Sequence, residues 1–128
     1  MTPELTLLLW STILTFVLIM IPAGDALRQN GADLQAGPRD ELPEPSVFNK
    51  RASRLSKNML ENMVLFTPLV LVAHVSGASN EMTLLGAQIF FYARLAHAVV
   101  YLAGWPKIRP LIWFVSVVGM TLIAIQLF

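Results

Sequence analysis

The stretch Arg51–Asn62 constrains the fold most, because it is polar and yet runs without a break into the apolar segment Met63–Val75. These 13 apolar residues rise about 20 Å as a helix, whereas a bilayer's hydrocarbon core is about 30 Å thick and needs about 20 residues. Counting back from Val75 to that length leads to Ser56. A membrane-spanning helix here would carry four polar side chains at hydrocarbon depth: Lys57, Asn58, Glu61 and Asn62. Such groups are tolerated mainly where they face protein or water.

Composition supports a membrane protein. The chain of 128 residues is 55% hydrophobic and 13% charged, against roughly a quarter charged in soluble proteins. We therefore predict a single integral membrane domain covering residues 1–128. The net charge of +1 gives no overall field that would favour nucleic acid as a partner. The chain has no cysteine and only two, well-separated histidines, so we predict no metal site, and any thiol chemistry needs an imported thiol.

Hydrophobic runs and breakers divide the chain into four predicted membrane helices, at about residues 5–26, 50–75, 82–104 and 110–128. Pro22 and Gly24 mark the end of the first, and Gly104-Trp105-Pro106 ends the third. Residues 27–49 mix glycine, proline and both charges, which predicts a surface loop with little regular structure. The expected fold is an all-α, up-down-up-down four-helix membrane bundle.

The basic residues predict the orientation. Lysine and arginine gather in the first loop with the start of the second helix, and in the loop at residues 105–109: Arg28, Arg39, Lys50, Arg51, Arg54 and Lys57, then Lys107 and Arg109. The opposite helix ends carry none. The positive-inside rule therefore places loops 27–49 and 105–109 in the cytoplasm and both termini outside.

Helical spacing predicts two polar stripes. Steps of three, four and three residues align four side chains on the second helix: Arg51, Arg54, Asn58 and Glu61. Steps of three and four align three on the third helix: Arg94, His97 and Tyr101. Measured along both helices from the short turn between them, Glu61 and Arg94 lie at about equal depth. We therefore expect the stripes to face each other, with Asn58 near His97 and Arg54 near Tyr101.

These charges allow more than one interpretation. Glu61 and Arg94 at equal depth are expected to form a structural ion pair that sets the helix register. That pair leaves an excess of positive charge, because Glu61 is the one acid among the cations Arg51, Arg54, Lys57, Arg94 and Arg109. An excess of cations suits an anionic ligand that carries carboxylates. The same cations would also suit contact with anionic lipid headgroups.

The second and third helices carry two motifs. The first is Arg51-x-x-Arg54-x-x-Lys57-Asn58-x-x-Glu61, and the second is Ala93-Arg94-Leu95-Ala96-His97-x-x-x-Tyr101-Leu102, with Arg109 after it. Together they resemble the signatures of MAPEG proteins, the membrane-associated proteins of eicosanoid and glutathione metabolism, which include microsomal glutathione transferases. The segment Gly37-Pro38-Arg39-Asp40 is most similar to the bacterial members, so we expect a bacterial inner-membrane protein.

The resemblance implies a homotrimer that binds glutathione between adjacent protomers at the cytoplasmic side. Matched by motif, the residues that bind glutathione are Arg51, Arg54, Lys57, Asn58, Glu61, Arg94 and His97, with Arg28 loosely matched to a family arginine. Glu61 suits the amino group. Tyr101 would line the pocket and Arg109 would stabilise the thiolate, since a nearby cation lowers a thiol pKa from about 8.5. A lipophilic electrophile would enter from the lipid.

Three hypotheses follow. The first is a glutathione-dependent transferase or peroxidase that acts on lipophilic electrophiles. The second is a non-catalytic protein of the same fold, which binds a lipid or a partner and uses Glu61 and Arg94 as a structural ion pair. The third is a small multidrug exporter, which would be expected to place a carboxylate inside its first helix. The first helix has none between Leu5 and Asp25, which argues against the exporter.

Overall fold

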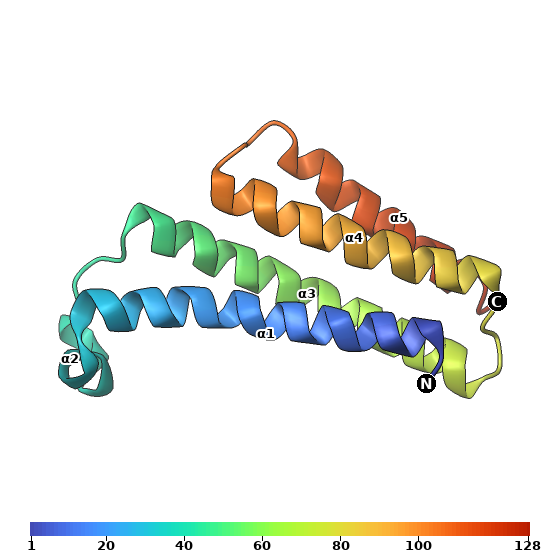
Figure 1. Ribbon diagram of the computed structural model, residues 1–128, viewed down its shortest axis with the longest axis horizontal. Coiled ribbons are helices and arrows are strands. Elements are labelled where there is room, and N and C mark those ends of the chain that lie inside the picture. Colours follow the sequence, from blue (N-terminus) through green and yellow to red (C-terminus); the bar gives the residue numbers. More distant parts are fainter.

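The computed structural model describes residues 1–128 and is all-helical (Figure 1). Its long helices are α1 (Pro3–Asn30), α3 (Val47–Val75), α4 (Glu81–Ala103) and α5 (Arg109–Ile125). The short helices α2 (Ala32–Ala36) and η1 (Arg39–Glu41) lie between α1 and α3. Both termini and the α3–α4 turn lie at one end, here called the terminal end, and the α4–α5 loop lies toward the other, here called the basic end. The prediction of an all-α bundle is confirmed.

The helices have the length and surface of membrane spans. Three of them, α1, α3 and α4, are long and apolar enough to cross a membrane, and α5 is apolar with 17 residues. Large apolar side chains face outward on all four, including Phe16, Val64, Val99 and Leu111, which are 60–70% exposed. Lipid tails cover such side chains without cost. The chain is therefore a membrane helical bundle.

The long helices pack chiefly as two pairs, α1 with α3 and α4 with α5, while α3 and α4 touch less extensively. Figure 1 shows the α1–α3 pair extending past the α4–α5 loop. The α4–α5 pair depends on Gly86 and Gly119. A Cβ atom on Gly86 would lie 2.5 Å from the Gly119 carbonyl oxygen, and one on Gly119 would lie 2.6 Å from that of Gly86. Small residues of this kind let helix backbones approach closely inside membranes.

Aromatic stacking joins the two pairs in the core. The rings of Phe66 on α3 and Phe90 on α4 lie 3.8 Å apart between centroids with an interplanar angle of 12°. Both side chains are fully buried, together with Leu55, Met59 and Ile123. This contact fixes how α4 lies along α3.

Polar contacts secure the terminal end. The Asn80 side chain accepts hydrogen bonds from the backbone N–H groups of Met82 and Thr83 and so caps α4. The Thr83 hydroxyl donates to Glu4 Oε1 at 3.1 Å, and both side chains are buried. Glu4 thus lies close to the N-termini of both α1 and α4, where helix dipoles favour negative charge.

The connection between α1 and α3 corrects the predicted loop at residues 27–49. The helix α1 continues to Asn30, and α2 and η1 add regular structure, so the expectation of little regular structure was wrong for these residues. Glycine, proline and charge clusters mark breaks, yet they leave room for short helices between the breaks. Further along, Lys50 forms an ion pair with Glu44, and this hydrogen-bonded cation holds the pKa of the Glu44 carboxyl below its ordinary value.

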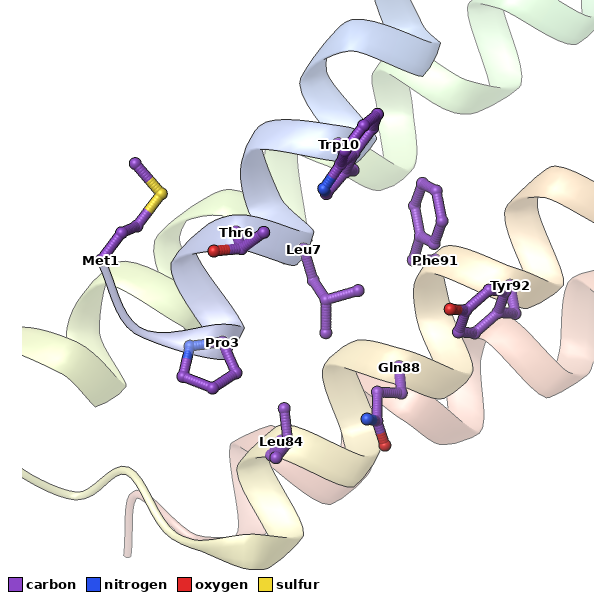
Figure 2. A pocket seen from close by; sticks show the side chains of 9 residues that line it. All are labelled: Met1, Pro3, Thr6, Leu7, Trp10, Leu84, Gln88, Phe91 and Tyr92. Carbon is purple, nitrogen blue, oxygen red and sulfur yellow. The ribbon is translucent and has the colours of Figure 1, made fainter.

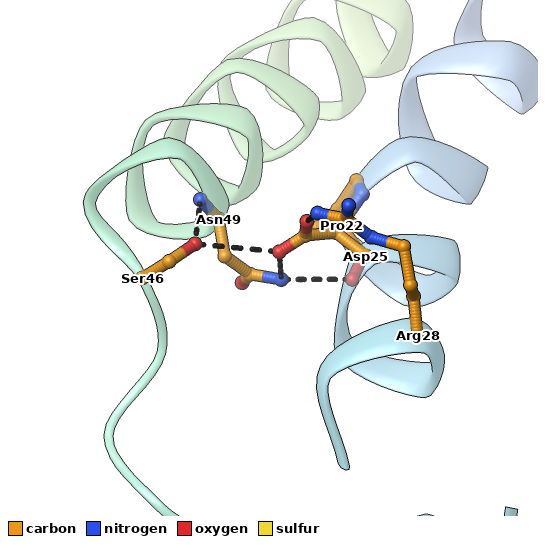
Figure 3. Close-up of polar contacts among 5 residues, drawn as sticks. All are labelled: Pro22, Asp25, Arg28, Ser46 and Asn49. Carbon is orange, nitrogen blue, oxygen red and sulfur yellow. Dashed lines mark hydrogen bonds and ion pairs between the residues drawn. The ribbon is translucent and has the colours of Figure 1, made fainter. Parts of the chain in front are cut away.

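A polar cluster fastens this connection to the bundle (Figure 3). Asp25 accepts hydrogen bonds from Arg28 Nη2 at 2.9 Å, Asn49 Nδ2 at 3.1 Å and the Ser46 hydroxyl at 3.3 Å. Asn49 Nδ2 also donates to the Pro22 carbonyl at 2.9 Å. The Ser46 side chain also caps α3 by accepting from the Asn49 backbone. These bonds tie the start of α3 to the end of α1.

Candidate functional site

Arg94 is the centre of a buried polar cluster between α3 and α4. Only 1% of the residue is exposed. Its Nη2 atom donates to Asn58 Oδ1 at 2.8 Å, and its Nε atom lies 3.3 Å from Met59 Sδ. The remaining guanidinium nitrogen, Nη1, is buried and has no hydrogen-bond partner. A buried donor without a partner costs free energy, so this nitrogen has capacity for one more acceptor.

His97 and Tyr101 continue this line along α4 toward the basic end. His97 is 2% exposed, and its Nδ1 atom is buried without a partner. Its ring lies 5.4 Å from that of Tyr101, which is half-buried. The Arg109 guanidinium, at the start of α5, lies over the Tyr101 ring with Cζ 4.8 Å from the centroid. The structure thus brings Arg94, His97, Tyr101 and Arg109 into one continuous row.

The expected ion pair between Glu61 and Arg94 is wrong for this chain. The prediction that Glu61 and Arg94 lie at about equal depth was close. Phe66 and Phe90 stack on each other, and they lie five residues after Glu61 and four before Arg94. The facing direction differs, because the buried side of α3 runs through Met59 and Met63, and Glu61 projects outward as an exposed residue. Equal depth brings two side chains together only when both face the same interface.

Asn62 is the residue that the motif analysis missed. It is buried on α3, and its Nδ2 atom donates to the Asn58 backbone oxygen at 2.8 Å and contacts Asn58 Oδ1 at 3.4 Å. Asn62 therefore supports the amide that binds Arg94. The signal was present in the sequence, because Asn58 and Asn62 are four residues apart, a spacing that places two side chains on the same face of a helix.

Three charged residues of α3 project outward from the single chain. Arg54, Lys57 and Glu61 are exposed, and their spacing of three and four residues places them on one side of the helix. We call these three residues the α3 charged stripe. None of them forms an ion pair within the chain. The stripe lies beside Asn58, which connects it to the buried cluster.

Two further predicted residues have other contacts. Arg51 is half-buried and donates from Nη1 to the Leu102 carbonyl at 3.2 Å, at the end of α4. Arg28 is paired with Asp25 at 2.9 Å, and its side chain is 83% exposed. Arg28 therefore belongs to the cluster that fastens α1 to α3, and no bond joins it to the row on α4.

A separate groove of about 610 Å³ lies between α1 and α4 at the terminal end (Figure 2). Figure 2 shows Leu7 and Trp10 on α1 across the groove from Phe91 on α4. Met1, Pro3 and Leu84 complete the apolar lining, and Thr6, Gln88 and Tyr92 are the polar side chains. None of the predicted site residues lines it.

The fold and the row of Arg94, His97, Tyr101 and Arg109, of which the first two are buried, define a membrane helical bundle with a cationic polar site near its basic end. A family model described as "MAPEG family" matches residues 5–128, nearly the whole chain. The protein therefore belongs to the MAPEG family, and the resemblance drawn from the motifs is confirmed. No curated protein matches the chain.

Proposed function

We propose that the protein is a glutathione-dependent membrane transferase or peroxidase that acts on lipophilic electrophiles. The observation that carries this proposal is the position of the α3 charged stripe beside Asn58, which hydrogen-bonds to Arg94 in the row that continues through His97 and Tyr101 to Arg109. MAPEG proteins generally use glutathione, and this chain supplies no thiol of its own. The orientation expected from the positive-inside rule would put the site at the cytoplasmic side.

The charges of the stripe match those of glutathione, which carries carboxylates, an ammonium group and a thiol. Arg54 can bind a carboxylate with two parallel hydrogen bonds, and Lys57 can add a point charge. Glu61 suits the ammonium group because it is exposed and unpaired in the chain. Asn58 offers an amide to the peptide backbone of the ligand.

A homotrimer with glutathione between protomers would explain why the stripe is exposed. Lys57 and Glu61 lie within 20 residues of Val75 on a membrane-spanning helix, where lipid tails offer charges no hydrogen bond. A second copy of the chain and a charged ligand would cover them. Lipids would contact the remaining apolar surface, and the electrophile would reach the site from the lipid.

Arg109 and Tyr101 are suited to act on the thiol. Arg109 is the first residue of α5, so its guanidinium and the helix N-terminus both favour a nearby negative charge. Both effects lower a thiol pKa and raise the fraction of thiolate at neutral pH. In conjugation, the thiolate would form a bond to an electrophilic carbon while the leaving group departs with its electron pair. In peroxide reduction, it would attack one peroxide oxygen, the O–O bond would break to release an alkoxide, and a second glutathione would convert the resulting sulfenic acid to the disulfide and water. The Tyr101 hydroxyl could donate the proton that the leaving group or the alkoxide takes up.

Equilibrium binding of glutathione to the purified protein in detergent tests the proposal, with the thiolate followed by its ultraviolet absorbance near neutral pH. We expect saturable binding with a thiolate signal, loss of that signal in Arg109→Ala, and binding weakened about tenfold or more in Arg54→Ala and Asn58→Ala. An absence of binding at millimolar glutathione would refute the proposal. So would unchanged binding in the Arg54 and Asn58 variants.

The non-catalytic alternative loses its main structural element. It assigns Glu61 and Arg94 to a structural ion pair, and in this chain Arg94 bonds to Asn58 while Glu61 is exposed. Binding of an anionic lipid in place of glutathione would still satisfy the cations of the stripe. The binding experiment separates the two, because only a thiol ligand gives the thiolate signal.

A further inference from the structure

Arg51 differs from the other cations of α3 because it contacts the bundle itself. Its Nη1 atom donates to the Leu102 carbonyl at 3.2 Å, and the side chain is half-buried. Arg54, one turn further along α3, is exposed and forms no ion pair. The two arginines share a motif but have different surroundings.

The contact supplies a hydrogen-bond donor and a positive charge to the C-terminal end of α4. The last carbonyls of a helix have no partner within it, and cations near this end are favourable. The last turn of α4 has no basic residue, and Arg51 supplies one from α3. Gly104 ends α4 in the left-handed conformation at φ 79°, and a Cβ atom there would lie 3.1 Å from Arg51 Cζ. Glycine therefore provides both the backbone turn and the space for the guanidinium.

This bond joins α3 to α4 at the end of the bundle where the α4–α5 loop begins. Three side-chain contacts of hydrogen-bond type join α3 to α4, and two of them come from Arg94 in the core. The Arg51 bond is the one at the α4–α5 loop. Leu102 directly follows Tyr101, and the short loop after Gly104 leads to Arg109, which packs on the Tyr101 ring. Arg51 therefore holds the part of the chain that carries both residues.

We propose that Arg51 is a positioning residue that fastens the α4–α5 loop to α3, so that Arg109 and Tyr101 stand at a fixed distance from a ligand held by Arg54 and Asn58. The inference rests on the proposed function and gives Arg51 a different role from the ligand role that its motif suggests. A loop that moved away from α3 would carry the thiolate-stabilising cation with it, while the residues that hold the ligand would remain in place.

The test compares Arg51→Ala and Arg51→Lys with Arg54→Ala as the matched control. Three quantities are measured: the Kd for glutathione, the pH midpoint of thiolate formation in the complex, and amide hydrogen exchange of residues 104–108. For Arg51→Ala we expect faster exchange in the loop, a thiolate midpoint raised by about one pH unit, and a Kd within about threefold of the original. Arg51→Lys can still donate to the Leu102 carbonyl, so its loop exchange and thiolate midpoint should stay close to those of the unsubstituted protein.

The control should show the opposite pattern. Arg54→Ala is expected to weaken glutathione binding about tenfold or more, since it removes a charge-assisted hydrogen bond, and to leave loop exchange unchanged. Exchange in peptides around Phe66 and Phe90 serves as a folding check for every variant.

Two outcomes would overturn the inference. One is a loss of affinity in Arg51→Ala equal to that in Arg54→Ala with unchanged loop exchange, which would make Arg51 a ligand residue. The other is no change in loop exchange or thiolate midpoint. If the unsubstituted protein binds no glutathione, the proposed function fails, and loop exchange in Arg51→Ala still decides whether Arg51 fastens the loop.

Discussion

Arg94 is a buried cation whose bonded partner in this chain is a neutral amide. Burying a charge is costly unless it is well hydrogen-bonded. Asn58, supported by Asn62, therefore stabilises Arg94 in its buried position. One guanidinium nitrogen stays free in the core, next to His97 with its own free ring nitrogen. Both nitrogens have hydrogen-bonding capacity that the chain does not use.

The stability of the bundle should depend more on Asn58 than on Glu61. We expect Asn58→Ala to lower the free energy of unfolding by about 1.5–3 kcal/mol, because it removes a hydrogen bond to a buried charged group. Glu61→Gln, which keeps the size of an exposed side chain, should have a clearly smaller effect in the isolated protomer. Unfolding by SDS in mixed micelles measures both. The reverse order would indicate that Glu61 is the true partner of Arg94.

At the scale of helices, the α4–α5 pair is the tightest element of the bundle, because two glycines place backbone against backbone. Each glycine faces the carbonyl oxygen of the other. A Cβ atom added at either position would meet this backbone oxygen, which cannot move aside as the end of a flexible side chain can. The pair carries Tyr101 on one helix and Arg109 on the other. Its geometry therefore determines how these two residues meet.

An added methyl group at this crossing should separate the helices. We expect Gly86→Ala to destabilise the protein by about 1–3 kcal/mol, since its Cβ would lie 2.5 Å from the Gly119 oxygen. Gly24→Ala is the matched control, because that glycine is also helical and has nothing within 4 Å of its added Cβ. The control should be neutral or slightly stabilising. Thermal unfolding in detergent distinguishes the two, and equal effects would argue against the close crossing.

At the scale of the whole molecule, the segments that carry every lysine and arginine except Arg94, from the end of α1 to the first part of α3 and from the α4–α5 loop to the start of α5, lie toward one end of the bundle, and the termini lie at the other (Figure 1). This asymmetry predicts the orientation in the membrane. A chain without cysteine allows a direct measurement, because a single introduced cysteine is the only labelling site.

We expect Arg39→Cys and Lys107→Cys to react with a membrane-impermeant thiol reagent only after the cells are opened. Ser79→Cys, in the turn between α3 and α4, should react in intact cells, since it lies at the end without lysine or arginine. The physical reason is that positively charged loops are retained on the cytoplasmic side. Labelling of all three from the same side would contradict the predicted four spans.

The sequence by itself determined the class, the number of long helices, their approximate ends and the polar residues that lie within them. These properties follow from local rules, because apolar length, glycine and proline breaks and the helical repeat act within one segment. The two motifs were also sufficient to identify the family. The end of α1 at Asn30 and the helices α2 and η1 were missed, because short helices in a polar connection carry little periodic signal.

Only the tertiary structure decided which polar residues meet. Periodicity placed Glu61 and Arg94 at a common depth, but the direction in which α3 faces α4 was set by the stacking of Phe66 and Phe90 and by the buried methionines beside them. The same packing turned Arg51 toward the end of α4 and left Arg54 outside. A helical repeat defines the angle between residues on one helix, whereas the rotation of that helix against its neighbour depends on how two surfaces fill space together.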